Sequence, residues 1–155
     1  MAMPQYFKAV ERSRMSEAVS LLGNIAGAQQ RKYLQINRYA TDYQGLDVAP
    51  AGATGDTYYT KGDVSDGTGG NGFQVTIAGT DYEDGIATAT RVADTGTLNY
   101  EYNLTRYYAS NDTTCNGTNA NGESLCADFC GIDTPVASCC STGTSSACEA
   151  PVTGN

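Results

Sequence analysis

The sequence contains no histidine and no tryptophan. Histidine is the side chain that most often acts as a general acid or base near neutral pH, and it is a common metal ligand. Its absence disfavours most acid–base and metal-dependent enzymes. In addition, no apolar run approaches the roughly 20 residues that a membrane-spanning helix needs. We therefore expect a protein that is not an enzyme and that uses no cofactor and no bound metal.

The charge of the chain is large and unevenly distributed. The 155 residues have a hydrophobic content of 40%, which suits one folded domain over residues 1–155. Of the net charge of −8, residues 1–38 carry a net +4 and the remainder a net −12. An acidic body repels nucleic acid and anionic lipid at long range. We expect no nucleic acid partner for the isolated domain, and a basic helix on an acidic body could pair with other copies of the same chain.

The first part of the chain has the pattern of a long helix. Pro4 suits the first turn, where its missing N–H is not needed. From Ala18 to Ile36 the apolar residues recur at intervals of three and four, which predicts a helix over residues 4–36 with one apolar stripe. Residues 6–17 carry five charges and few apolar groups, so we expect that half of the helix to be exposed on an isolated domain.

The middle of the chain changes from irregular to β-like. Residues 37–72 are rich in Gly, Asp, Thr and Ala, which predicts a long irregular segment. From Phe73 to Ala109, alternating and β-branched segments are separated by short turn sequences, which predicts a three-strand antiparallel sheet over residues 73–109. The apolar stripe of the helix can cover the apolar face of this sheet. The expected fold is therefore α+β, with a long N-terminal helix packed on an antiparallel β-meander.

All six cysteines lie in the polar C-terminal segment, residues 110–155. An even number of cysteines in a segment too polar to form its own core is typical of a disulfide framework in an oxidising compartment. Zinc is disfavoured because the paired spacings of zinc sites are absent. The spacing does not choose among the 15 possible pairings, except that adjacent cysteines rarely bridge each other because the ring is strained. We expect a cross-linked loop region, with no bond between Cys139 and Cys140, formed by Cys115, Cys126, Cys130, Cys139, Cys140 and Cys148.

Three weaker motifs have simpler explanations. The glycine-rich GTGGNG at residues 67–72 follows a loop and opens a strand, whereas a nucleotide-binding loop follows a strand and opens a helix. The acidic clusters DVSDG and DYEDG lack the spacing of a calcium loop and have turn composition. The Asn-x-Thr triplets at residues 103, 111 and 116 are common by chance in a chain rich in Asn and Thr, so the sequence does not decide whether they are modified.

One long segment carries a more specific signal. Residues 3–48 read MPQYFKAVERSRMSEAVSLLGNIAGAQQRKYLQINRYATDYQGLDV. The proline and tyrosine after an apolar stub, the basic turn KAVERSRMSEA, and the later AQQRKY and RYATDYQGLDV together resemble the bacterial type IV pilin and pseudopilin family. The resemblance implies that residues 4–36 are the outer half of the long pilin helix, that residues 37–72 are the αβ-loop, and that the cysteine-rich region corresponds to the pilin D-region.

The resemblance also implies a function and a missing part. Pilins begin with an apolar segment of membrane-spanning length, and the opening Met-Ala-Met resembles its last residues, so we expect this sequence to be a truncated soluble piece of a longer protein. The implied function is a structural subunit of an extracellular type IV pilus for adhesion, motility or DNA uptake. Before assembly the subunit would reside in the inner membrane, and its partners would be other copies of the pilin and the assembly machinery. We expect a major subunit, although no motif separates major from minor pilins.

In such a filament, the charged half of the helix would contact neighbouring subunits. Candidate interface residues are Tyr6, Lys8, Arg12, Arg14 and Glu17. Two alternatives stay open at this point: a pseudopilin of a type II secretion system, and a secreted disulfide-rich binding or adhesin module.

Overall fold

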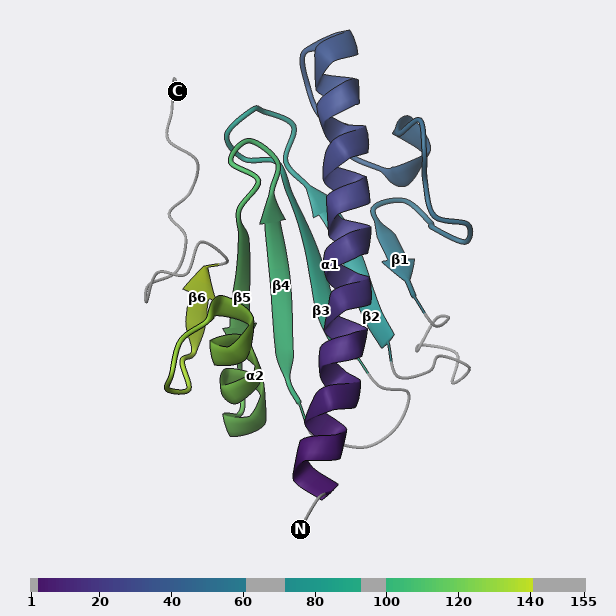
Figure 1. Cartoon of the computed structure of the whole chain (residues 1–155). Coiled ribbons are helices and arrows are strands. Elements are labelled where there is room, and N and C mark those ends of the chain that lie inside the picture. Colours follow the sequence, from purple (N-terminus) through teal and green to yellow (C-terminus); the bar gives the residue numbers. More distant parts are fainter. Residues whose placement is uncertain (1–2, 61–71, 93–99, 141–155) are drawn as a thin grey trace.

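The computed structural model describes residues 3–60, 72–92 and 100–140, with the side chains of the first helix described from Lys8 onward. A long helix, α1, crosses one face of a six-stranded antiparallel sheet whose spatial order follows the sequence, β1 to β6 (Figure 1). A second, shorter helix, α2, packs beside it on β5 (Figure 1). The elements are α1 (Met3–Ile36), η1 (Tyr43–Gly45), β1 (Thr57–Tyr59), β2 (Gly72–Ala78), β3 (Ile86–Val92), β4 (Tyr102–Tyr107), β5 (Thr113–Gly117), α2 (Ala120–Cys130) and β6 (Ser138–Cys140).

The apolar stripe of α1 faces the sheet as its spacing predicts. Ala18, Leu22, Ile25 and Ala28 are all at most 2% exposed. Residues at this spacing share one side of a helix, and that side lies against β3 and β4. The stripe ends before the helix does, because Ile36 is 46% exposed. The expected α+β fold, a long helix on an antiparallel sheet, is confirmed.

The three central strands follow the alternation in the sequence. In β2, Phe73, Val75 and Ile77 are buried, and in β4, Tyr102 and Leu104 are buried. β3 pairs with both, in a register that places Ala89 opposite Val75 on one side and opposite Leu104 on the other. The small alanines of β3 leave room under α1 for the larger side chains of the neighbouring strands.

The sheet is larger than the sequence predicts. The segment 37–72, expected to be irregular, contains the short strand β1 at one edge. The C-terminal region is cross-linked as expected, but over residues 113–140 it is not a loop: β5 and β6 extend the sheet at its far edge, and α2 packs on β5. Both edge strands have only three residues, and short edges limit pairing with other chains.

The segment after α1 is held to the body by side-chain contacts with backbone groups. The buried Gln29 amide donates to the Ala40 carbonyl (2.9 Å) and accepts from the Ala40 N–H (2.8 Å). The buried Tyr43 hydroxyl donates to the Val75 carbonyl on β2 (2.9 Å). These bonds satisfy polar groups that would be costly to bury unpaired, and they fix residues 39–46 against the sheet.

Helix α2 has local start and stop signals. The side chain of Asn119 caps its first turn by accepting from the Gly122 N–H, and Gly131 ends it in the left-handed conformation (φ 73°). Its inner face is formed by Leu125, Cys126 and Cys130. Within the described residues, no helix is both long and apolar enough to cross a membrane.

Candidate functional site

The first half of α1 carries the residues predicted to contact neighbouring subunits, and much of it faces the domain instead. Glu11 is 3% exposed and Met15 is 5% exposed. The expectation that this half is exposed is wrong at these two positions. The sequence gives five charges in this stretch, and the structure brings most of them to specific partners.

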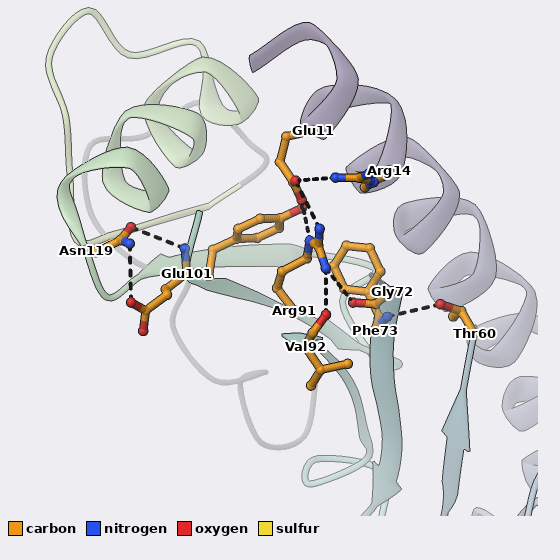
Figure 2. A network of polar contacts seen from close by, with 10 residues as sticks. Glu11, Arg14, Thr60, Gly72, Phe73, Arg91, Val92, Glu101 and Asn119 are labelled. Carbon is orange, nitrogen blue, oxygen red and sulfur yellow. Dashed lines mark hydrogen bonds and ion pairs between the residues drawn. The ribbon is translucent and has the colours of Figure 1, made fainter. Parts of the chain in front are cut away.

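Glu11 is the centre of a buried polar network, which we call the Glu11 cluster (Figure 2). Its carboxylate accepts from Arg91 Nε on β3 (2.6 Å) and from the Tyr102 hydroxyl on β4 (2.7 Å). Arg14, one turn further along α1, also lies 3.2 Å from this carboxylate. The cluster therefore joins α1 to two central strands at once.

Arg91 is almost fully enclosed, with a side chain that is 3% exposed. Beyond Glu11, its Nη1 donates to the carbonyls of Gly72 (3.1 Å) and Val92 (2.7 Å), as Figure 2 shows. Its guanidinium also lies over the Phe73 ring, 5.8 Å from the centroid. A buried charge is tolerated only when it is paired and hydrogen-bonded, and Arg91 meets both conditions.

The network alters the acidity of its members. Burial raises the pKa of Glu11, but the hydrogen bonds from Arg91 and Tyr102 and the Arg91 charge outweigh this effect, so the pKa lies below its ordinary value. Burial, followed by the charge of Glu11, raises the pKa of Tyr102 far above its ordinary range. Glu11 is thus ionised, and Tyr102 is a permanent donor, throughout the physiological pH range.

A second polar group, the Asp128 cluster, ties the start of α1 to α2. Lys8 Nζ lies 2.8 Å from Asp128 Oδ2 and donates to the Ser124 hydroxyl (2.8 Å). Arg12 forms an ion pair with the same carboxylate. Burial raises the pKa of Asp128, but the hydrogen bonds from Lys8 and Arg12 and the charges of these two residues together lower it by more. The pKa of Asp128 therefore lies below its ordinary value. The Asp128 side chain is 31% exposed, so this cluster contributes less to stability than the Glu11 cluster.

The predicted interface residues are therefore in different situations. Lys8, Arg12 and Arg14 have carboxylate partners inside the chain. Glu17 is exposed and lines a shallow cavity on the outer side of α1. Tyr6 lies outside the described side chains. Besides Glu17, this cavity is lined by four small polar residues and one apolar residue: Ser13, Ser16, Ser20, Asn24 and Leu21.

The cysteines connect β5, α2 and β6 at one edge of the sheet. One disulfide joins Cys115 on β5 to Cys126 on α2, and another joins Cys130 at the end of α2 to Cys139 on β6. Cys139 and Cys140 therefore do not bridge each other. Cys140 is also disulfide-bonded, and Cys148 lies outside the described residues. Both disulfides lie in the C-terminal half of α2 and fix it covalently to the two neighbouring strands.

Three residues of these clusters were not predicted from the sequence: Arg91, Tyr102 as a polar partner, and Asp128. They lie 80, 91 and 116 positions from their partners on α1. No local pattern links such distant residues. One feature of the sequence does point to the Glu11 cluster. Arg91 is a basic residue inside a β-branched segment, and a charge on the inner face of a strand requires a partner.

The weaker motifs are only partly visible. The acidic segment DVSDG and most of GTGGNG lie outside the described residues, and Gly72 begins β2. Within the described ranges, no group of three or more His, Cys, Asp or Glu side chains could hold a metal ion.

Comparison with known proteins gives one match. The family described as "Type IV minor pilin ComP, DNA uptake sequence receptor" matches residues 4–90, more than half of the chain. No curated protein and no solved structure matches. The match covers α1, the segment that follows it, and the strands up to the middle of β3. Because the family is one of minor pilins, it does not support the expected major subunit. The chain belongs to the type IV minor pilin family, and it is a component of a type IV pilus.

Proposed function

We propose that this chain is a minor pilin that is built into an extracellular type IV pilus as a structural subunit, after a stage in the inner membrane. The observation that carries the proposal is the family match over residues 4–90. The α+β fold with a long leading helix supports it. The match to a pilus family favours this function over a pseudopilin of a secretion system and over a free-standing adhesin module.

The arrangement of α1 suggests how the subunit would work in a filament. The Glu11 cluster and the Asp128 cluster fix the first half of α1 to the sheet and to α2. A helix held in this way would move with its domain as one body when the subunit enters the filament. The contacts with neighbouring subunits would then use the outer side of α1, around Glu17, rather than Lys8, Arg12 and Arg14.

The test is whether the complete protein enters pili. The gene, with its natural N-terminus, is expressed with an epitope tag at the C-terminus, and pili are sheared from the cells and collected. We expect the tagged protein in the sheared fraction, at low abundance, and its loss from that fraction in a strain without pilus assembly machinery. Recovery only in the membrane fraction, with normal pili on the same cells, would refute a structural role in the filament.

DNA binding is a second candidate function, and the description of the family favours it. The net charge of −8 argues in the other direction. Five of the eight lysines and arginines that the structure describes pair with carboxylates of the same chain. Among the described residues, the cations without a carboxylate partner are Lys32, Arg38 and Arg106. Lys32 and Arg38 line one shallow cavity near the end of α1, so they are the first candidates to contact phosphate.

A salt titration decides between these possibilities. Fluorescence anisotropy of a labelled DNA duplex is measured with the 155-residue chain at low and at physiological salt. A DNA receptor would bind, would weaken as salt rises, and would lose affinity in Lys32→Gln/Arg38→Gln. No binding at low salt would exclude DNA reception by this domain and would leave the filament role untouched.

A further inference from the structure

A small cavity lies at the C-terminal end of α1, where the β2–β3 turn and the β4–β5 turn approach the helix. It has a volume of about 230 Å³. Four tyrosines form most of its walls, together with two other residues of α1: Tyr33, Tyr39, Tyr82, Tyr108, Gln30 and Leu34. We call it the tyrosine cavity. Neither polar cluster described above contributes to it, and all of its walls belong to the described part of the chain.

The tyrosine rings run from the interior to the surface. Tyr108 and Tyr39 are at most 2% exposed and have centroids 4.8 Å apart. Tyr33 follows at 5.0 Å from Tyr39, and Tyr82, which is 39% exposed, lies 5.7 Å from Tyr33 with an angle of 63° between the rings. Rings that meet edge to face form a corner rather than a closed stack. The exposed Leu34 extends this apolar corner at the mouth of the cavity.

The cavity also offers hydrogen-bonding groups. The hydroxyls of Tyr33 and Tyr82 make no hydrogen bond within the described part of the chain. Gln30 donates through its amide nitrogen to the Tyr108 carbonyl (2.8 Å) and to Asn111 Oδ1 (3.0 Å), which leaves its carbonyl oxygen available as an acceptor. An apolar corner with a few polar groups at its rim is the usual composition of a small-ligand site. The volume suits a single six-membered ring.

A cation without a carboxylate partner among the described residues lies next to this site. Arg106 on β4 donates to the same Asn111 Oδ1 that accepts from Gln30, at 3.4 Å. Its Nε is buried and has no hydrogen-bond partner among the described residues. Among the described residues, Lys32 and Arg38 also lack a carboxylate partner, but neither has a buried nitrogen without a hydrogen bond, as Arg106 has. The guanidinium as a whole is only half-buried, so its two Nη atoms can donate to a carboxylate, which can accept two parallel hydrogen bonds.

The surroundings disfavour a ligand with many negative charges. Asp81, Glu83 and Asp84 lie in the same turn as Tyr82. Burial, followed by electrostatic interactions with the neighbouring tyrosines and with Asp84, raises the pKa of Tyr39 to about 12. This acidic turn would repel a polyphosphate backbone, which carries a charge on every unit, more strongly than a ligand with a single carboxylate.

We propose that the tyrosine cavity and Arg106 bind an acidic sugar unit, that is, a pyranose ring that carries one carboxylate. The C–H-rich face of the ring would pack in the corner of Tyr33 and Tyr82, its hydroxyls would bond Gln30 and the tyrosine hydroxyls, and the carboxylate would pair with Arg106. The proposal goes beyond the pilus role and does not depend on filament assembly. The domain would then bind glycans that contain such an acidic sugar.

The proposal is tested by ligand-observed and protein-observed NMR titration of the 155-residue chain. The probes are methyl β-D-glucuronide, the methyl glycoside of N-acetylneuraminic acid, and neutral methyl β-D-glucoside. We expect at least one acidic glycoside to bind about tenfold more tightly than the neutral one, as one charge-assisted pair implies. Chemical shift changes should centre on residues 30–34, 82 and 106–111.

Three variants separate the parts of the site. Arg106→Met should remove the preference for the acidic glycoside, and Tyr82→Ala should weaken both kinds of probe. Arg38→Met is the matched control, because Arg38 also lacks a carboxylate partner but is exposed, and it should change neither affinity. Circular dichroism checks the fold of Arg106→Met, and the turn variant Tyr82→Ala gives an independent readout if that fold is disturbed. Equal affinity for acidic and neutral probes, or no binding of any probe at millimolar concentration, would overturn the proposal.

Discussion

The two helices of this protein are held to the same sheet by different means. Helix α1 is long and uses an apolar stripe, continued at its start by the Glu11 cluster and the Asp128 cluster. Helix α2 has 11 residues, and disulfides at Cys126 and Cys130 fix it to β5 and β6. A short helix buries too little apolar surface to order itself, so covalent bonds supplement its packing. The long helix is therefore attached by apolar packing with ion pairs at its start, whereas the short helix also needs disulfides.

The largest effect is expected from breaking the Glu11 cluster. Arg91→Met should lower the free energy of unfolding by about 3–5 kcal/mol, because it leaves the Glu11 carboxylate buried without its countercharge. Chemical denaturation followed by circular dichroism measures the change. The double variant Glu11→Gln/Arg91→Met should be less destabilised than Arg91→Met alone, since no uncompensated charge remains. A loss within the error of the measurement for Arg91→Met would show that the ion pair does not hold α1.

Removal of one α2 disulfide is expected to have a somewhat smaller effect. Cys115→Ser/Cys126→Ser should cost about 2–4 kcal/mol, mainly by increasing the conformational freedom of the unfolded chain. The same denaturation experiment applies, with hydrogen exchange to locate the change. Protection should fall in α2 first and remain in α1 between Ala18 and Gln29. Equal loss of protection in both helices would contradict the contrast between them.

The pH dependence of the stability of Glu11→Gln tests whether the charge of the Glu11 carboxylate stabilises the fold. At pH 7 this variant should be less stable by about 1.5–3 kcal/mol, the usual cost of hydrogen bonds to a charged group, because Arg91 keeps the Gly72 and Val92 carbonyls as acceptors and the introduced glutamine side chain keeps an acceptor oxygen. The pKa of Glu11 is below its ordinary value of 4.5 in the folded state, so its contribution is complete above about pH 4.5 and is lost as the pH falls through the folded-state pKa. The difference between the wild type and the variant should therefore shrink below pH 4.5. A difference that stays constant down to pH 3 would show that the carboxylate charge is not responsible.

The smallest effect is expected for the exposed ion pair of α1. Arg31 binds both carboxylate oxygens of Asp47 (2.7 and 2.9 Å), but both side chains are largely exposed. Water and salt screen such a pair, so Arg31→Gln should leave the unfolding midpoint indistinguishable from that of the wild type. A destabilisation as large as that of Arg91→Met would mean that exposed and buried pairs contribute alike here.

The parts of the fold that follow local periodicity could be predicted from the sequence. The three- and four-residue spacing from Ala18 along α1, and the alternation of Phe73, Val75 and Ile77, depend only on which residues face the core. The strand β5 gives no such signal, because its buried residues are two threonines, a cysteine and a glycine. Helix α2 has a capping Asn119 and a terminal Gly131, but its Gly- and Asn-rich first turn is also typical of a loop.

The candidate site was less predictable, for a physical reason. A charged residue on a helix is normally solvated, so the sequence predicts that Glu11 belongs to an exposed face. Its burial depends on Arg91 and Tyr102, which lie on two strands 80 and 91 positions away along the chain. Such pairs are set by tertiary structure and leave no spacing in the sequence.

The most direct test of the account is native-state hydrogen exchange of the wild type and Arg91→Met, with each amide of α1 resolved. The account holds that ion pairs attach the first half of α1 to its own domain and that apolar packing attaches the second half. It predicts that amides from Lys8 to Ser16 lose protection in Arg91→Met, while those from Ala18 to Gln29 keep most of theirs. Unchanged protection from Lys8 to Ser16, or an equal loss along the whole helix, would contradict it.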